Sequence, residues 1–152
     1  MTNKQYDYII HTDGGYSRKY NVGAFAFVIC DRSDMEIKRG AWKIENETNN
    51  RAELKAIIAA LNHVPSKNCS VLVISDSQYA LMTLSGKWSR NSNTDLFPIH
   101  DRIVNENGLD VDYKWVKGHS GDTFNEICDE LCNQAVGFNL NEEYVKYKRQ
   151  KA

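Results

Sequence analysis

The sequence lacks any long apolar run, and this absence excludes several classes of protein. No stretch approaches the ~18–20 consecutive apolar residues that a membrane-spanning helix needs. The opening MTNKQYD also has no apolar core of the kind found in a secretory signal. We therefore expect a cytoplasmic protein with no membrane partner. Its 152 residues, 41% hydrophobic and 26% charged, match a soluble globular domain with one sizeable core.

Cysteine is scarce, and its four positions form no metal-binding pattern. Cys30, Cys69, Cys128 and Cys132 include no CxxC pair, and the last two lie one helical turn apart without a histidine nearby. This spacing argues against zinc and indicates reduced structural thiols in a reducing compartment. A GxGxxG fingerprint is absent as well, which counts against a small-molecule-binding α/β domain.

Neither sign of charge is in marked excess. The chain has 19 Lys and Arg residues against 20 Asp and Glu residues, so its formal net charge is −1. Tight nonspecific nucleic-acid binders are usually basic, and composition alone therefore argues against such a partner. A metal-dependent nuclease is a partial exception, because its acidic residues are concentrated at the site and divalent cations neutralise them. Composition leaves this class open.

The apolar patterning that is present predicts a mixed α/β fold with the element order βββαβααβα. The predicted strands are 8–12, 23–30, 36–44, 71–75 and 111–116, and the predicted helices are 50–64, 77–84, 95–107 and 123–136. Short connections favour an antiparallel meander of the first three strands, and a helical crossover favours a parallel neighbour. No repeat or Gly/Ser linker divides the chain. We expect one domain over residues 1–140 and a charged tail over 141–152.

Four acidic residues fit poorly with purely structural roles. Asp13 and Asp76 each follow an apolar strand, and in parallel neighbours both would emerge at the carboxyl edge of the sheet, where open α/β sheets bind ligands. Glu53 shares the apolar stripe of its helix, and Asp129 flanks that of the last helix. Ordinary explanations remain open: a turn former or helix cap for each Asp after a strand, a capping-box partner of Asn50 for Glu53, and solvated surface for Asp129.

Taken together, these acids predict a metal site. Clustered carboxylates repel one another, and burying them unpaired is costly, so such a group needs cations. All-oxygen ligands suit Mg²⁺ or Mn²⁺ and not zinc or copper.

Five sequence blocks combine the candidate acids with further polar residues. They are TDGG at 12–15, TNNRAEL at 48–54, SDSQY at 75–79, WVKGHSG at 115–121 and NEICDEL at 125–131. In their order and spacing these blocks resemble those of type 1 ribonuclease H, and the resemblance covers most of the chain. The resemblance implies an α/β fold with a five-stranded mixed sheet, three antiparallel strands followed by two parallel ones, and helices on both faces. It also implies a monomeric endonuclease that hydrolyses the RNA strand of RNA–DNA hybrids, leaving 5′-phosphate and 3′-hydroxyl ends.

The resemblance also assigns roles residue by residue. Asp13, Glu53, Asp76 and Asp129 match the metal-binding carboxylates, which hold two Mg²⁺ ions with Mn²⁺ as a substitute, and Asp13 bridges both ions. His119 matches a mobile-loop histidine that assists protonation or product release and completes the catalytic set.

A substrate-binding set follows from the same blocks. Its members are Gly14, Thr48, Asn49, Asn50 and Gln78. The three amides match minor-groove readers, because an amide can both donate and accept hydrogen bonds with 2′-hydroxyls and base edges. Thr48 matches a phosphate contact on the DNA strand, and it is also a helix-start signal.

The chain departs from many family members in two places. The loop at 15–22 is shorter than in many members. Some members also carry a substrate handle, which is a basic helix with an adjacent loop, and here that region is reduced to 86–93, where only Lys87 and Arg90 are basic. Trp88 either stacks on the substrate or is buried, and the basic stretch 144–151 either contacts nucleic acid or solubilises the chain. The alternatives to a hybrid nuclease are a noncatalytic hybrid-binding module on the same fold and a related nuclease that cuts DNA.

Overall fold

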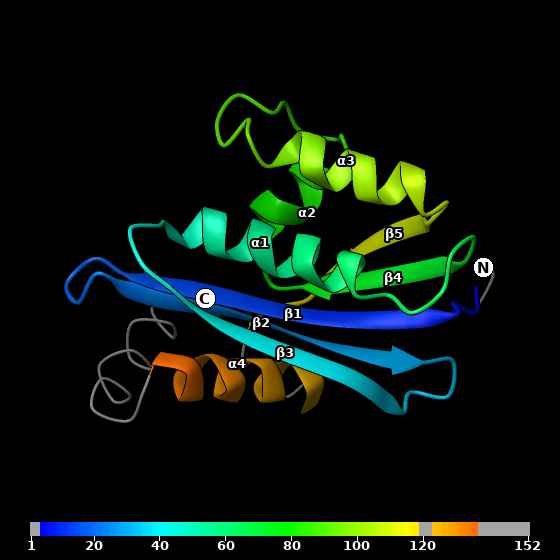
Figure 1. Ribbon diagram of the computed structural model, residues 1–152, viewed down its shortest axis with the longest axis horizontal. Helices are drawn as coiled ribbons and strands as arrows, with labels where there is room; N and C mark the ends of the chain where they lie inside the picture. The colour runs from blue at the N-terminus through cyan, green and yellow to red at the C-terminus, as the bar shows by residue number, and fades with distance from the viewer. Residues whose placement is uncertain (1–3, 119–122, 137–152) are drawn as a thin grey trace.

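Every predicted strand and helix forms in the computed structural model, which describes residues 4–118 and 123–136 (Figure 1). In chain order the elements are β1 Tyr8–Ser17, β2 Val22–Asp31, β3 Glu36–Ile44, α1 Asn49–Asn62, β4 Ser70–Ser75, α2 Gln78–Leu84, α3 Phe97–Glu106, β5 Asp110–Trp115 and α4 Thr123–Val136. None of the helices in these ranges is long and apolar enough to cross a membrane.

The strands form one five-stranded mixed sheet in the order β3-β2-β1-β4-β5. The β1–β2 and β2–β3 pairs are antiparallel, whereas β1–β4 and β4–β5 are parallel. In Figure 1, α1, α2 and α3 lie on one side of the sheet and α4 lies on the other. The predicted fold class is confirmed.

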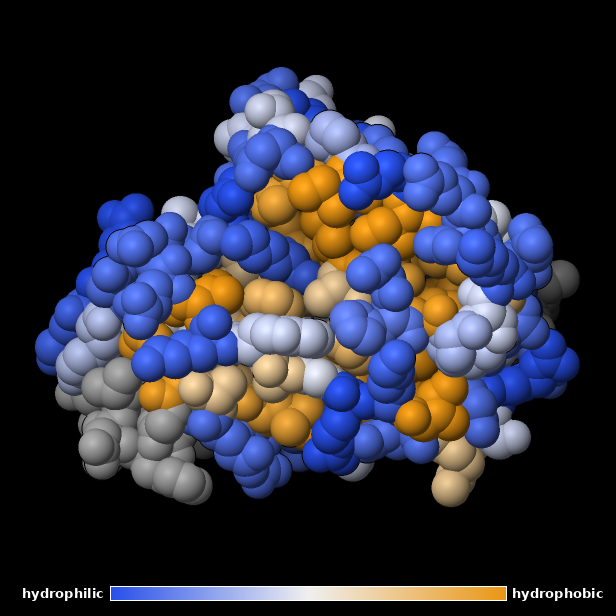
Figure 2. Space-filling model, in the orientation of Figure 1, coloured by the Kyte–Doolittle hydropathy of each residue, from blue (hydrophilic) through white to orange (hydrophobic). Residues whose placement is uncertain are grey.

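Each face of the sheet has its own apolar core because β1 and β2 alternate their side chains between the two sides. Ile10 and Phe27 pack with the α1 side, and Ala26 and Val28 pack with Cys128 of α4. Cys30, Cys128 and Cys132 are buried in the core on the α4 side of the sheet. Figure 2 shows that the exposed surface in this view is largely hydrophilic, with apolar residues gathered where α1 and α3 meet.

The first strand is longer than predicted. The Asp13-Gly14-Gly15 segment resembles a turn, but β1 continues through it to Ser17, and Gly14 pairs with Phe25 of β2. A Cβ atom on Gly14 would lie 2.7 Å from the backbone carbon and oxygen of Ala52 in α1. The glycine is therefore required where helix and strand approach closely, and not at a turn.

Candidate active site

Three of the predicted carboxylates meet at one edge of the sheet. Asp13, Glu53 and Asp76 each offer an oxygen, and these oxygens all lie within 4.8 Å of one another. The parallel register accounts for the two aspartates: Tyr8 pairs with Val71 at an offset of 63 residues, and Asp76 follows Asp13 by the same 63. Asp13 thus lies within β1 and not after it, but it is level with the first residue beyond β4.

Glu53 reaches this cluster from the buried face of α1. Its side chain is only 4% exposed. The capping-box explanation is wrong, because Thr48 is the N-cap and its Oγ1 accepts the Arg51 N–H at 3.2 Å, which places Asn50 inside the helix. Helix capping therefore does not explain why a carboxylate lies at this buried position.

The capping explanation for Asp76 is also wrong. Ser77 caps α2, and its Oγ accepts the Ala80 N–H at 3.1 Å. Trp115 Nε1 donates to the Asp76 carbonyl at 3.1 Å and fixes the backbone there. Oδ1 of Asp76 is buried and has no hydrogen-bond partner among the described residues. A buried carboxylate oxygen without a partner is costly, so it indicates a missing cation or donor.

Asp129 lies on α4, outside the group of three but close to the strand that supports it. The Cys128 and Cys132 thiols, on either side of Asp129 along the helix, donate to the carbonyls of His11 at 3.3 Å and Asp13 at 3.7 Å. The Asp129 side chain is partly buried. His119, the fifth predicted catalytic residue, lies outside the described residues.

The donor set of the cluster fits a hard divalent cation. Carboxylate oxygens alone are the ligands that Mg²⁺ and Mn²⁺ prefer, and no described histidine or cysteine joins the group. Asp13 Oδ1 also accepts the Gly14 N–H at 2.9 Å, which orients one carboxylate before any ion binds.

The predicted substrate-binding residues surround the start of α1 and α2. Thr48 and Asn50 are exposed at the first turn of α1, and Gln78 is exposed at the first residue of α2. Asn49 Oδ1 accepts the Tyr16 N–H at 2.7 Å, so this amide oxygen braces β1. Gly14 is buried against α1 and has no side chain to offer.

A hollow of about 330 Å³ lies beside this helix start, and sequence reasoning missed part of its lining. Thr48, Asn49 and Asn50 line it together with Tyr16 and Arg18. Arg18, one of two basic residues in the short loop after β1, thus lies next to a helix N-terminus, an arrangement suited to an anion.

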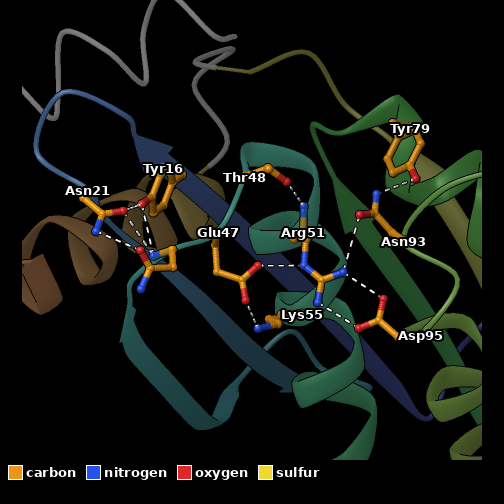
Figure 3. Close-up of polar contacts among 10 residues, drawn as sticks. Tyr16, Asn21, Glu47, Thr48, Arg51, Lys55, Tyr79, Asn93 and Asp95 are labelled. Atoms are coloured by element: carbon orange, nitrogen blue, oxygen red, sulfur yellow. Dashed lines mark hydrogen bonds and ion pairs between the residues drawn. The ribbon is translucent and has the colours of Figure 1, made fainter.

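Sequence reasoning also missed an ion-pair network that joins α1 to the segment before α3 (Figure 3). Arg51 donates to both carboxylate oxygens of Asp95 at 2.9 Å and to Glu47 at 2.7 Å. Asn93 accepts from Arg51 at 3.5 Å and donates to the Tyr79 hydroxyl of α2 at 2.9 Å. The hydrogen bonds from Arg51 lower the pKa of Asp95 to about 2. This network holds the starts of α1 and α2 in fixed relation.

The reduced handle segment contains one structural basic residue and one exposed tryptophan. Arg90 donates to the Thr83 and Leu84 carbonyls at 2.8 and 3.0 Å and to Asp101 at 2.7 Å. Its guanidinium therefore makes its hydrogen bonds within the protein. Trp88 is 45% exposed, so the alternative that it is buried is wrong.

Comparison with known proteins gives consistent results. The sequence matches the RNase H family over residues 5–137. It is 32% identical to the Ribonuclease H of Caldicellulosiruptor saccharolyticus in an alignment covering 84% of this chain and 94% of that protein. It is 34% identical to the Ribonuclease H of Hahella chejuensis, covering 88% and 95%.

Solved structures agree with the sequence relatives. LC11-RNase H1, isolated from compost by a metagenomic approach, superposes with a TM-score of 0.72 at 26% identity, covering 86% of this chain and 95% of that chain. The structure of LC11-RNase H1 in complex with an RNA/DNA hybrid superposes with a TM-score of 0.69 at 25% identity, covering 85% and 96%.

Proposed function

Because the chain belongs to the ribonuclease H family, we propose that it is an endonuclease that hydrolyses the RNA strand of RNA–DNA hybrids with divalent metal ions. The observation that carries this proposal is the group of Asp13, Glu53 and Asp76, whose oxygens lie within 4.8 Å of one another at the carboxyl edge of the sheet. Neither helix capping nor turn formation explains this cluster.

The proposed metal ligands are these three carboxylates together with Asp129. Two bound Mg²⁺ ions would supply an activated water on one side of the scissile phosphate and stabilise the leaving 3′-oxygen on the other, giving 5′-phosphate and 3′-hydroxyl products. Asp13, which lies within β1 and whose Oδ1 accepts the Gly14 N–H, would be the ligand shared by both ions. His119 would transfer a proton at the leaving side or assist product release.

The exposed amides at the helix starts are proposed to select the substrate. Asn50 and Gln78 would bind 2′-hydroxyls and base edges in the minor groove, while Thr48 and Arg18 would hold a phosphate of the DNA strand beside the α1 N-terminus. The complex of LC11-RNase H1 with an RNA/DNA hybrid supports this class of substrate. We also propose a monomer that acts in the cytoplasm.

The principal alternative is a noncatalytic hybrid-binding module. The buried Asp76 Oδ1, which has no hydrogen-bond partner in the described ranges, favours the nuclease, because a binding module gains nothing from that cost.

One cleavage assay tests the proposal. Purified protein is incubated with labelled RNA–DNA hybrid, duplex DNA and duplex RNA of one sequence, with Mg²⁺, with Mn²⁺ and with chelator. We expect cleavage of the hybrid's RNA strand only, only with metal, and with 5′-phosphate ends. Binding of the hybrid without cleavage in either metal would instead support the module.

A further inference from the structure

A hollow runs along the outer edge of β5 and takes no part in the proposed catalytic chemistry. Its volume is about 800 Å³. Consecutive strand residues point to opposite faces of a sheet, yet Val111 through Trp115 all line this hollow. It therefore follows the open edge of β5, the last strand of the sheet, between α2 and the segment that precedes β1.

Two tryptophans make this hollow, which we call the β5 groove, an aromatic surface. Trp88 is 45% exposed and Trp115 is 47% exposed, and both line the groove. A soluble protein rarely leaves two such side chains open to water at one site without a use for them. Trp42, by comparison, stacks on Phe25 at the opposite edge of the sheet.

The charge of the β5 groove is opposite in sign to that of the chain. Its lining includes Lys4, Lys87 and Lys114, with Asp112 as the one acidic side chain. Asp112 is already matched, because it accepts from Lys4 at 3.1 Å and from the Tyr6 hydroxyl at 2.6 Å. Lys87 and Lys114 thus give a positive groove on a protein whose formal net charge is −1.

The β5 groove is continuous with the candidate active site. Gln78, one of the proposed minor-groove readers, also lines the groove. Trp115 connects the two directly, since its indole N–H donates to the carbonyl of Asp76 at 3.1 Å. A polyanion that passes through the active site can therefore extend into the groove.

We infer that the β5 groove binds unpaired nucleotides that flank the hybrid, as a single-strand site beside the catalytic centre. Exposed tryptophans stack on bases that are free to unstack, whereas bases inside a duplex already stack on one another. The lysines would contact the phosphates of the same strand. The inference rests on the proposed function for the identity of the substrate, but single-strand binding itself requires no catalysis.

Single-strand binding is measured first, by fluorescence anisotropy of labelled oligo(dT) and oligo(U) with metal-free protein. Wild type is expected to bind at least one of them. Trp88→Ala should weaken binding roughly 5- to 150-fold, the range for loss of one stacked base. Lys87→Gln with Lys114→Gln should lower the log–log salt slope by about 1.4, since each single-strand phosphate contact contributes about 0.7.

A charge-matched control uses exposed lysines elsewhere. Lys38→Gln with Lys67→Gln removes the same charge from β3 and from the turn before β4, away from the groove, and should leave oligonucleotide binding unchanged. Failure of wild type to bind either oligonucleotide would overturn the inference. The inference would also be overturned if wild type, the Trp88 variant and the Lys87/Lys114 variant bound the oligonucleotides with equal affinity.

Cleavage then separates this inference from the proposed function. A hybrid with a single-stranded extension on either strand should have a lower KM than the blunt hybrid for wild type, whereas Trp88→Ala should show the same KM for the extended and the blunt hybrid. Equal KM values for blunt and extended substrates would overturn the groove's role. Absence of all hybrid cleavage would overturn the proposed function, and anisotropy would still decide whether the groove binds single strands.

Discussion

Burial distinguishes two acidic residues of the site, Asp13 and Glu53, from the acids of the surface. Asp13 and Glu53 are 3% and 4% exposed, whereas acids such as Asp34 and Asp110 lie in open turns or at strand ends. An apolar stripe on α1 places Glu53 against the sheet, and the parallel register places Asp13 level with Asp76. The cost of bringing these charges together is what makes the free protein receptive to cations.

At the residue scale, Asp76→Asn should abolish most hybrid cleavage without disturbing the fold. The amide keeps the size of the side chain but removes an anionic oxygen. A loss of several kcal/mol of metal-dependent transition-state stabilisation corresponds to a decrease in the cleavage rate of roughly 100-fold or more. Without metal, the melting temperature should stay the same or rise, because carboxylate repulsion decreases. Thermal melts with Mg²⁺ and with chelator, beside cleavage rates, measure both effects.

The matched control for this variant is Asp34→Asn, the same chemical change in the exposed turn between β2 and β3. Asp34 has a φ of 62°, a conformation that Asn adopts readily, so stability and cleavage should both stay near wild type. Near wild-type cleavage by Asp76→Asn would remove Asp76 from the metal site.

Gly14→Ala tests the close approach of β1 and α1. The added Cβ would lie 2.7 Å from the Ala52 carbonyl group, so helix and strand must separate, at a cost of about 1–3 kcal/mol. Separation also moves Asp13 away from Glu53, and cleavage should decrease together with stability. Denaturant unfolding and hybrid cleavage measure the two effects.

Gly86→Ala is the corresponding control, because its Cβ would meet open space and only the positive φ of 83° opposes it. It should lose about 1 kcal/mol and retain cleavage. Full stability and activity in Gly14→Ala would show that the approach of α1 to β1 is not tight.

At the scale of elements, the Arg51 network connects three segments that the sequence pattern treats as independent. Arg51 lies in the first turn of α1, Asp95 precedes α3, and Asn93 reaches Tyr79 of α2. The exposed amides Asn50 and Gln78 belong to two of these segments, so the network sets the distance between them. Arg51 is therefore a positioning residue and does not itself need to touch the substrate.

The pH dependence of this network has a definite sign. The Asp95 pKa is lowered from 3.8 to about 2 by Arg51, so the ion pair stabilises the folded state fully above the unfolded pKa. That contribution decreases as the pH falls from about 4 toward 2. The melting-temperature difference between wild type and Asp95→Asn should thus be constant from about pH 5 to 7, shrink below about pH 4, and also shrink with added salt.

A constant difference down to the lowest pH at which both proteins fold would contradict the ion-pair account. A second readout separates positioning from stability: Asp95→Asn should raise KM and weaken the preference for hybrid over duplex RNA, with kcat little changed. Asp101→Asn, which weakens the Arg90 contact instead, should change stability without changing that preference.

Local pattern predicted the elements, and long-range contacts account for what it missed. Apolar and β-branched runs bounded by turn residues predicted the strands, and apolar residues at helical spacing predicted the main helix. The stripe containing Glu53 indicated a charge on a buried face. The predicted end of β1 was wrong because Gly14 serves the close packing of β1 against α1, a contact with Ala52 that spans 38 residues of the sequence. The Arg51–Asp95 pair, 44 residues apart, has no local signal at all.

At the scale of the whole molecule, charge limits how tightly this near-neutral chain can hold a polyanion. Of the two basic residues predicted to replace the handle, Arg90 is committed to Asp101 and to two carbonyls, which leaves Lys87. With few phosphate contacts, hybrid binding should be weak, with a log–log salt slope of about three or four. The exposed neutral residues Ser89, Asn91 and Ser92 lie in the same segment and are free to be changed.

Replacing Ser89, Asn91 and Ser92 by Lys should therefore lower KM and steepen the salt slope by up to about 2.7, since each duplex phosphate contact adds about 0.9. The turnover number should stay nearly constant, because the new lysines would bind the ground state and the transition state alike. Steady-state cleavage of one hybrid across a salt series measures both quantities in wild type and the variant.

The charge-matched control places three lysines at Ser33, Met35 and Asn62, exposed positions in the β2–β3 turn and at the end of α1, away from the carboxylates. A general effect of net charge would lower KM equally in both triple variants, whereas a local substrate contact lowers it only in the first. If the Ser89/Asn91/Ser92 variant matched wild type in both KM and slope, the segment at 86–93 would not face the hybrid. Weak binding would then need a cause other than the missing handle.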